Sequence, residues 1–171
     1  VSMNGNAEHL ALNNNYGFIF NQRNYTLLCC VKAIDNSDMQ VISGSWAIHE
    51  WSFEIRIKNS DGLFLAGWDA SGSGRRAYAT GQNSIAAYTK LAIVGQNGQL
   101  SKIFRNGSQI TSGVTHLGTG GQPTGGSLYS TIHIGKYVQA STSGKFDLRE
   151  LKLYDRTFTN QEILDWFNQP S

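Results

Sequence analysis

The chain has 171 residues, of which 40% are hydrophobic, and this size predicts one domain with one core over residues 1–171. Nineteen glycines, two prolines and only 15% charged residues are typical of an all-β domain with many turns. The net charge of +2 argues against a nucleic-acid partner, and no apolar run reaches the roughly 20 residues that membrane insertion needs.

The first half of the chain alternates short apolar runs with polar turns. The apolar cluster in residues 16–20 predicts a strand, after a start that is rich in asparagine. Residues 25–34 are apolar at both parities, which predicts a central strand that is covered on both faces. Cys29 and Cys30 are adjacent within it and therefore point to opposite faces. We expect two buried free thiols rather than a disulfide.

The next segments indicate a hairpin. Residues 35–38 have the composition of a turn, and residues 39–42 begin another strand. Residues 51–58 alternate strictly between apolar and polar side chains, which predicts a strand with one buried and one wet face. Asp61 and Gly62 then form a turn signal, so residues 63–68 are expected to return as its partner.

The middle of the chain combines a polar loop with a meander. Residues 69–76, DASGSGRR, are predicted to be a flexible loop, and two short strands are expected within residues 77–91. Asn97-Gly98 and Asn106-Gly107 are strong two-residue turn signals. They predict a meander of three strands, at residues 90–96, 99–105 and 108–111.

Residues 112–127 contain few apolar side chains and are predicted to form a long surface loop. Its glycine-rich part, residues 118–126, either carries function or is a tolerated insertion, and the sequence leaves both open. Residues 128–138 follow as a further strand that ends near Gly135.

The closing segment, residues 144–167, contains a strand, a corner and a capped helix. Its apolar residues keep a period of two but change phase near Arg149 and Glu150, which indicates a β-bulge or a change of buried face. Thr159 and Glu162 have the spacing of a capping box, and a short helix is predicted near residues 160–168. We expect Ile163, Leu164 and Phe167 to share one face of this helix and Trp166 to pack it down.

Three blocks of the sequence resemble the laminin-G-like or concanavalin A-like lectin/glucanase superfamily: IFRNG at residues 103–107, IHIGK at 132–136, and RELKLYDRTFTNQEI at 149–163. The last block is similar to the closing strand and helix of such domains, with phenylalanine at position 158 in place of the usual leucine. The resemblance implies a jelly-roll sandwich of two curved antiparallel sheets with a short C-terminal helix. It implies no particular ligand, because the matching residues are structural.

Two segments have the composition of a sugar-binding surface, in which aromatic rings stack on pyranoses and polar groups bond their hydroxyls. SGSWAIHEW offers Trp46 and His49. GWDASGSGRRAY offers Trp68 and a set of polar or aromatic neighbours, namely Asp69, Arg75, Arg76 and Tyr78. The alternative is that Trp46 and Trp68 belong to the core.

Catalysis and metal binding have weaker signals. Glu50 and Glu54 resemble a glycosidase carboxylate pair that lacks its central acid, so we expect no enzymatic activity. The histidines have neither a nucleophile motif nor zinc spacing. Asp35, Asn36 and Asp38 could supply oxygens to a calcium ion, although turn chemistry explains them equally well, so no cofactor is required.

The sequence favours a non-catalytic carbohydrate-binding or adhesion module, with a glycan or polysaccharide as its partner. We expect it to belong to a larger extracellular or virion-surface protein, such as a phage tail or capsid appendage, because few charges and many Asn, Gly, Ser and Thr residues suit such surfaces. A structural protein–protein interaction module is the alternative, and a glycoside hydrolase comes third.

Overall fold

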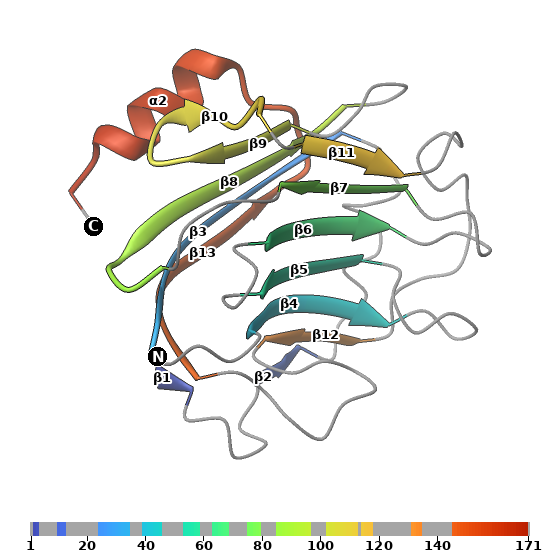
Figure 1. Ribbon diagram of the computed structural model, residues 1–171, viewed down its shortest axis with the longest axis vertical. Helices are drawn as coiled ribbons and strands as arrows, with labels where there is room; N and C mark the ends of the chain where they lie inside the picture. Colours follow the sequence, from blue (N-terminus) through green and yellow to red (C-terminus); the bar gives the residue numbers. More distant parts are fainter. Residues whose placement is uncertain are drawn as a thin grey trace.

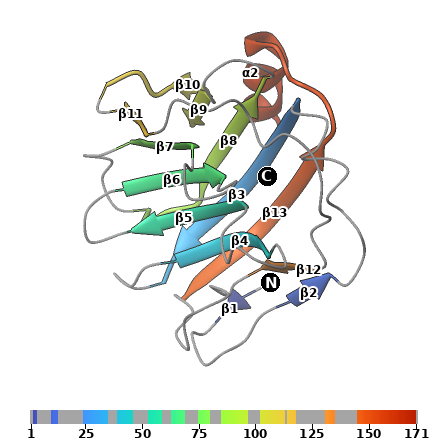
Figure 2. The same cartoon turned by 90° about the vertical axis from the view of Figure 1, so that its right-hand side faces the viewer.

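The computed structural model shows two antiparallel sheets packed as a sandwich, with a short helix on the outer side of one of them (Figures 1 and 2). The structure describes residues 2–3, 10–12, 24–34, 39–45, 53–58, 63–68, 75–79, 85–96, 102–112, 114–117, 131–134 and 145–170. The expected strand at residues 16–20 lies outside these ranges.

One sheet has six strands in the order β1-β13-β3-β8-β9-β10. The strands are β1 (Ser2–Met3), β3 (Tyr25–Ala33), β8 (Thr89–Gly95), β9 (Lys102–Arg105), β10 (Ser108–Gln109) and β13 (Phe146–Tyr154). β3 pairs with β13 on one side and β8 on the other, which confirms that it is a central strand. The expected meander is confirmed in β8, β9 and β10, and its two-residue turn has positive φ at Asn106 (47°) and Gly107 (86°).

The other sheet has seven strands in the order β11-β7-β6-β5-β4-β12-β2. The strands are β2 (Leu10–Leu12), β4 (Met39–Ser45), β5 (Phe53–Lys58), β6 (Leu63–Trp68), β7 (Arg75–Ala79), β11 (Val114–Leu117) and β12 (Thr131–Ile134). The pairing of β5 with β6 confirms the expected hairpin. The all-β jelly-roll sandwich and the helix at residues 160–168 are both confirmed.

Two loop expectations were wrong in part. Arg75 and Arg76 do not belong to a loop but begin β7, and residues 114–117 form β11 rather than surface loop. β7 pairs with β11 across a long separation in the sequence, so the local pattern does not show this partner. The two short strands expected within residues 77–91 also lie in different sheets, since β7 pairs with β6 and β11 while β8 pairs with β3 and β9.

The core between the sheets takes alternate residues of the six-stranded sheet. Its side chains are at most 8% exposed, and they are Tyr25, Leu27, Cys29, Val31, Leu91, Ile93, Ile103, Phe146 and Leu148. Both cysteines are buried and free, as expected. Burial raises the pKa of the Cys29 thiol to about 12, with a smaller contribution from Cys30, so Cys29 stays protonated as a small apolar group.

A β-bulge in β13 explains the change of phase in the closing strand. Leu148 pairs with Val31, but Glu150 rather than Arg149 pairs with Cys30, so one residue is inserted between them. Leu151 and Leu153 then pair with Cys29 and Leu27 and return to the inner face. The bulge therefore lets the apolar residues on both sides of it face the core, with Arg149 and Glu150 between them on the outer side.

The helix α2 (Asn160–Asn168) covers one end of the outer face of the six-stranded sheet (Figure 1). Ile163 and Trp166, 0% and 4% exposed, pack on a cluster of sheet residues, namely Leu28, Ala92, Val94 and Phe104. Trp166 packs the helix down as expected. Leu164 lies with Phe167 beside Gly107, as a shared face predicts, but it is 41% exposed and so lies at the edge of the packed face.

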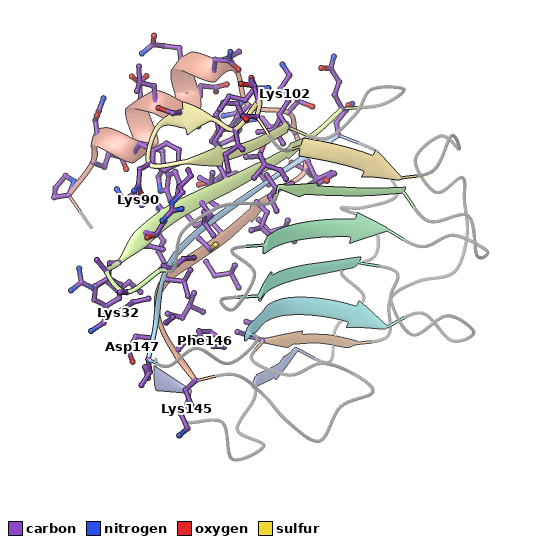
Figure 3. All side chains as sticks on the ribbon, viewed as in Figure 1. Lys32, Lys90, Lys102, Lys145, Phe146 and Asp147 are labelled. Atoms are coloured by element: carbon purple, nitrogen blue, oxygen red, sulfur yellow. The ribbon has the colours of Figure 1, made fainter. Side chains whose placement is uncertain are left out.

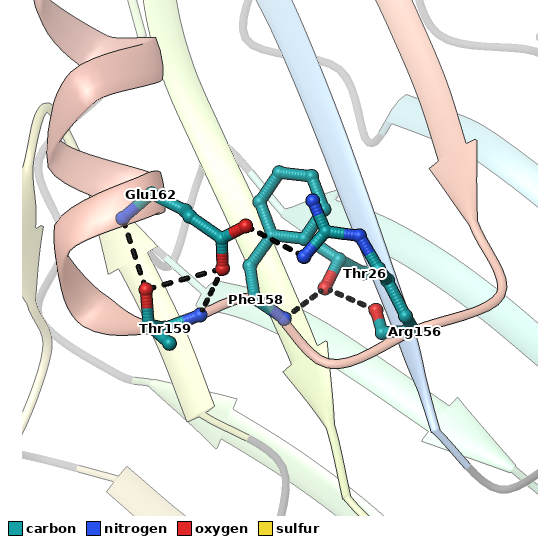
Figure 4. Close-up of polar contacts among 5 residues, drawn as sticks. All are labelled: Thr26, Arg156, Phe158, Thr159 and Glu162. Carbon is teal, nitrogen blue, oxygen red and sulfur yellow. Dashed lines mark hydrogen bonds and ion pairs between the residues drawn. The ribbon is translucent and has the colours of Figure 1, made fainter.

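The corner between β13 and α2 is held by a buried hydroxyl (Figure 4). Thr26, 0% exposed, donates to the Arg156 carbonyl at 2.8 Å and accepts from the Phe158 N–H at 2.9 Å. The capping box is confirmed, since Thr159 Oγ1 accepts from the Glu162 amide and Glu162 Oε2 accepts from the Thr159 amide. The Thr159 amide, followed by the Arg156 guanidinium, lowers the pKa of the Glu162 carboxyl.

Lys90 closes the other end of the helix. Its ammonium is almost buried and donates to the carbonyls of Trp166, Phe167 and Gln169 at 3.1, 3.2 and 2.5 Å. The Trp166 carbonyl also accepts from the Gln169 N–H at 3.2 Å, and a cation is favoured at this end of the helix by the helix dipole. The side chain lies beneath α2 in Figure 3, so it fixes the helix to β8 at the end opposite the capping box.

Candidate ligand-binding surface

Four residues of the expected sugar site lie in the hairpin of β6 and β7. Trp68 pairs with Arg75 at the end of the hairpin where the two strands are connected, and Tyr78 pairs with Leu65 further along. Residues that face each other across antiparallel strands have Cβ atoms about 5 Å apart on one side of the sheet. Trp68 and Arg75 therefore share one face, whereas Arg76 and Tyr78 occupy alternate positions on the other face.

The pairing also tells which of these faces is the interior. Ile134 is 7% exposed, and it pairs with Ile42, which pairs with Ile55. The row continues through Ala66 to Ala77, so it crosses five strands of apolar positions. Because Ile134 is buried, this row marks the inner face of the seven-stranded sheet. Position 75 and position 68 share this face, at the end of their strands.

The neighbouring row lies on the outer face and is chemically different. Successive pairings connect His133, Ser43, Glu54, Gly67 and Arg76 across β12, β4, β5, β6 and β7. We call this set the outer row. The row thus contains an imidazole, a hydroxyl and a carboxyl on three consecutive strands. A guanidinium follows them after one glycine position. Such a mixture supplies both donors and acceptors to a polyhydroxyl ligand.

A second outer-face row lies beside the outer row. It runs from Arg56 through Leu65 and Tyr78 to Thr115 on β11. It adds an aromatic position and a further guanidinium to the same side of the sheet as Arg76. Sugar recognition requires an aromatic group next to short polar groups, and the two rows together place both types on neighbouring strands.

Other candidates from the sequence lie outside the described residues. They are Trp46, His49 and Asp69 for the sugar site, Glu50 for the carboxylate pair, and Asp35, Asn36 and Asp38 for calcium. Their roles stay predictions. Within the described part of the chain, no group of three His, Cys, Asp or Glu residues could hold a metal ion, and no helix is long and apolar enough to cross a membrane.

Sequence reasoning missed the outer row as a unit. The strict alternation of residues 51–58 predicted one face for Glu54 and Arg56, and the register places both positions on the side opposite Ile55. Nothing local could bring His133 and Ser43 next to Glu54, because β12 joins β4 across a separation of about ninety residues. Only the order of the strands assembles this surface.

The chain matches the family model described as concanavalin A-like lectin/glucanases superfamily over residues 4–164. Among curated proteins, none matches the sequence. The fold is similar to that of the CBM40 module of a Ruminococcus gnavus IT-sialidase, with 11% identity, a TM-score of 0.72, and coverage of 99% of this chain and 96% of that one.

Two longer proteins contain a similar fold. A structure of botulinum neurotoxin type C, whose cell entry depends on two ganglioside molecules, has 13% identity and a TM-score of 0.65, with coverage of 96% of this chain and 41% of that chain. A Trypanosoma rangeli sialidase in complex with the inhibitor DANA has 12% identity and a TM-score of 0.66 over 97% of this chain and 27% of that chain. The chain thus spans less than half of these two proteins.

Proposed function

Because the chain belongs to the concanavalin A-like lectin/glucanase superfamily, we propose that it is a non-catalytic carbohydrate-binding module of a larger extracellular or virion-surface protein. The observation that carries this proposal is the outer face of the seven-stranded sheet, where the outer row lies beside Arg56 and Tyr78. Binding modules for glycans among proteins of similar fold support it.

The distribution of carboxyl groups supports binding rather than hydrolysis. Among the outer-face positions that the structure describes in β4 to β7, β11 and β12, Glu54 is the single acidic residue. Glycoside hydrolysis usually needs two carboxyl groups about 5 to 9.5 Å apart across the scissile bond. A lone carboxylate among donors is suited to accepting hydrogen bonds from sugar hydroxyls.

The outer row also suggests how a sugar would be held. Glu54 accepts from adjacent hydroxyls, and Arg76 donates to ring or hydroxyl oxygens two strands away. Gly67 lies between them without a side chain, so the backbone leaves room for a pyranose above it. Tyr78 supplies the aromatic surface on the same side. Position 68 lies on the inner face, so this proposal rests on the outer-face positions and not on Trp68.

A glycan array with the purified chain tests the proposal, once with millimolar calcium and once with chelator. We expect a positive glycan whose binding weakens at least about tenfold in Arg76→Gln, the loss of one charge-assisted contact. Lys102→Gln is the matched control, because it removes the same charge from the exposed surface of the other sheet. If no glycan binds under either condition, the structural protein–protein interaction module takes precedence.

A further inference from the structure

The outer face of the six-stranded sheet carries a second group of side chains away from α2. The Arg149 guanidinium lies over the Tyr88 ring at 3.6 Å from its centroid, and the Lys32 ammonium lies 5.8 Å from the same centroid. We call these three residues the Tyr88 patch. In Figure 3, Lys32 lies on the outer side of the six-stranded sheet, away from the seven-stranded sheet.

Each residue reaches the patch through a specific feature of the fold. Arg149 is the inserted residue of the β13 bulge and is exposed. Lys32 pairs with Asp147 on the neighbouring strand, and Tyr88 precedes β8 next to Thr89, which pairs with Val31. Arg149 follows the inward-facing Leu148, so it lies on the outer side of the sheet, and as the inserted residue it has no partner on β3.

Lys32 and Arg149 are not paired with carboxylates within the part of the chain that the structure describes. Ion pairs form there between Lys152 and Glu150 and between Arg156 and Glu162. Two acidic residues of β13 flank the patch: half-buried Asp147 pairs in register with Lys32, and Glu150 follows Arg149 but is bonded to Lys152 and Trp166. Two like charges held at one ring repel each other, and a bound anion would relieve this repulsion.

The geometry favours a planar anion. A guanidinium that stacks on an aromatic ring uses its flat face and keeps the N–H groups at its edge for other partners. This edge matches the two oxygens of a carboxylate in a bidentate pair, and Lys32 can contribute a further donor to the same group. The half-exposed Tyr88 ring lies under the Arg149 guanidinium and holds it in this orientation.

From these observations we propose that the Tyr88 patch is a second binding site, for the carboxylate of a uronic acid in an acidic polysaccharide. The inference rests on the proposed glycan-binding function, but it uses a different sheet and different residues. Arg149 forms the bidentate contact, Lys32 donates to the same carboxylate, and Tyr88 orients the guanidinium. Two sites on opposite sides of the sandwich would let one module bind two chains of a polysaccharide or two segments of one chain.

Binding of polygalacturonate to the whole chain, measured by calorimetry at low and at physiological ionic strength, tests this site. We expect the double variant Lys32→Gln/Arg149→Gln to bind at least about tenfold more weakly. The matched double variant Lys102→Gln/Lys152→Gln removes the same two charges from exposed positions and should change the affinity less than about threefold. Arg149→Lys keeps the net charge but loses the planar edge, and an intermediate loss is expected.

Three results would overturn the proposal. The first is no binding of polygalacturonate to the unmodified chain. The second is an equal loss in both double variants, or an equal preference for dextran sulfate, which would indicate attraction by bulk charge. The third is equally tight binding of poly-L-glutamate that the Lys32/Arg149 variant also abolishes, which would indicate an acidic protein segment. Arg76→Gln should leave polygalacturonate binding unchanged, so failure here is distinct from failure of the outer-row site.

Discussion

The Thr26 hydroxyl joins the central strand of the six-stranded sheet to the corner that precedes α2, and Thr26→Val tests how much this connection contributes. Valine has nearly the same shape as threonine, so the substitution leaves no cavity but removes both hydrogen bonds. The Phe158 N–H and the Arg156 carbonyl then lose their partner at 2.9 and 2.8 Å. An unsatisfied buried polar group costs about 1–3 kcal/mol.

The expected magnitude follows from the surroundings of these two groups. Thr26 itself is 0% exposed, whereas Arg156 lies at the surface, where water can reach its carbonyl more easily. We therefore expect Thr26→Val to lower the free energy of unfolding by about 2–3 kcal/mol, toward the lower half of the range for two groups. For a chain of this size, that corresponds to a decrease in Tm of roughly 4–12 °C.

Urea unfolding followed by circular dichroism measures this change, and the m-value should stay constant. Thr89→Val is a suitable control, because Thr89 is 4% exposed and its hydroxyl donates only to the nearby Ala87 carbonyl, at 3.1 Å. Its expected cost is about 1 kcal/mol. Hydrogen exchange should show lost protection in residues 156–168 for Thr26→Val alone. If Thr26→Val is no more destabilising than Thr89→Val, the hydroxyl does not hold the corner.

Three further predictions concern the same side of the sandwich. Lys90→Met removes the ammonium that donates to three carbonyls at the end of α2, so it should lower the free energy of unfolding in urea by about 2–4 kcal/mol. Lys102→Met, at an exposed position, should change this free energy by less than about 0.5 kcal/mol. Equal effects of the two substitutions would show that water satisfies these carbonyls. Burial raises the pKa of the Glu150 carboxyl, but hydrogen bonds from Lys152 and Trp166 outweigh burial and lower the pKa below its ordinary value of 4.5. The ionised carboxyl therefore stabilises the fold above pH 4.5, and this contribution is lost as the pH falls through the folded-state pKa. The stability difference between the unmodified chain and Glu150→Gln should therefore shrink in acid, and a constant difference from pH 7 to pH 3 would contradict this. Gly95→Ala places a Cβ against the Tyr25 ring, inside the core, and should lower the free energy of unfolding by about 3 kcal/mol. A Tm within about 2 °C of that of the unmodified chain, roughly the effect of less than 1 kcal/mol, would mean that the ring can move aside.

The closing segment shows how far a local pattern reaches. The capping box, the helix at residues 160–168 and the phase change near Arg149 were all predicted, because each depends on residues within a few positions of one another. The pattern did not show how far each side chain would be covered, since Leu164 stays 41% exposed while Ile163 and Trp166 are buried. Periodicity gives the angle between side chains, but the sheet beneath decides which of them it covers.

The long loops show where local pattern ends. Arg75 and Arg76 lie in a stretch rich in glycine and serine, and residues 114–117 follow another polar stretch, so both were expected outside strands. They form β7 and β11 because each completes the backbone hydrogen bonds of a neighbour in the seven-stranded sheet. A strand of this kind owes its existence to its partner more than to its own side chains.

By itself, the sequence determined the elements of this protein: alternating strands, two-residue turns, a bulged closing strand and a capped helix, together with the superfamily they indicate. The tertiary structure alone decided which residues became neighbours. The outer row joins β12 to β4, and the Tyr88 patch joins β3, β13 and the segment before β8. Sequence patterns report interactions over a few residues, whereas a binding surface on a sheet depends on strand order and register, which only the packed chain fixes.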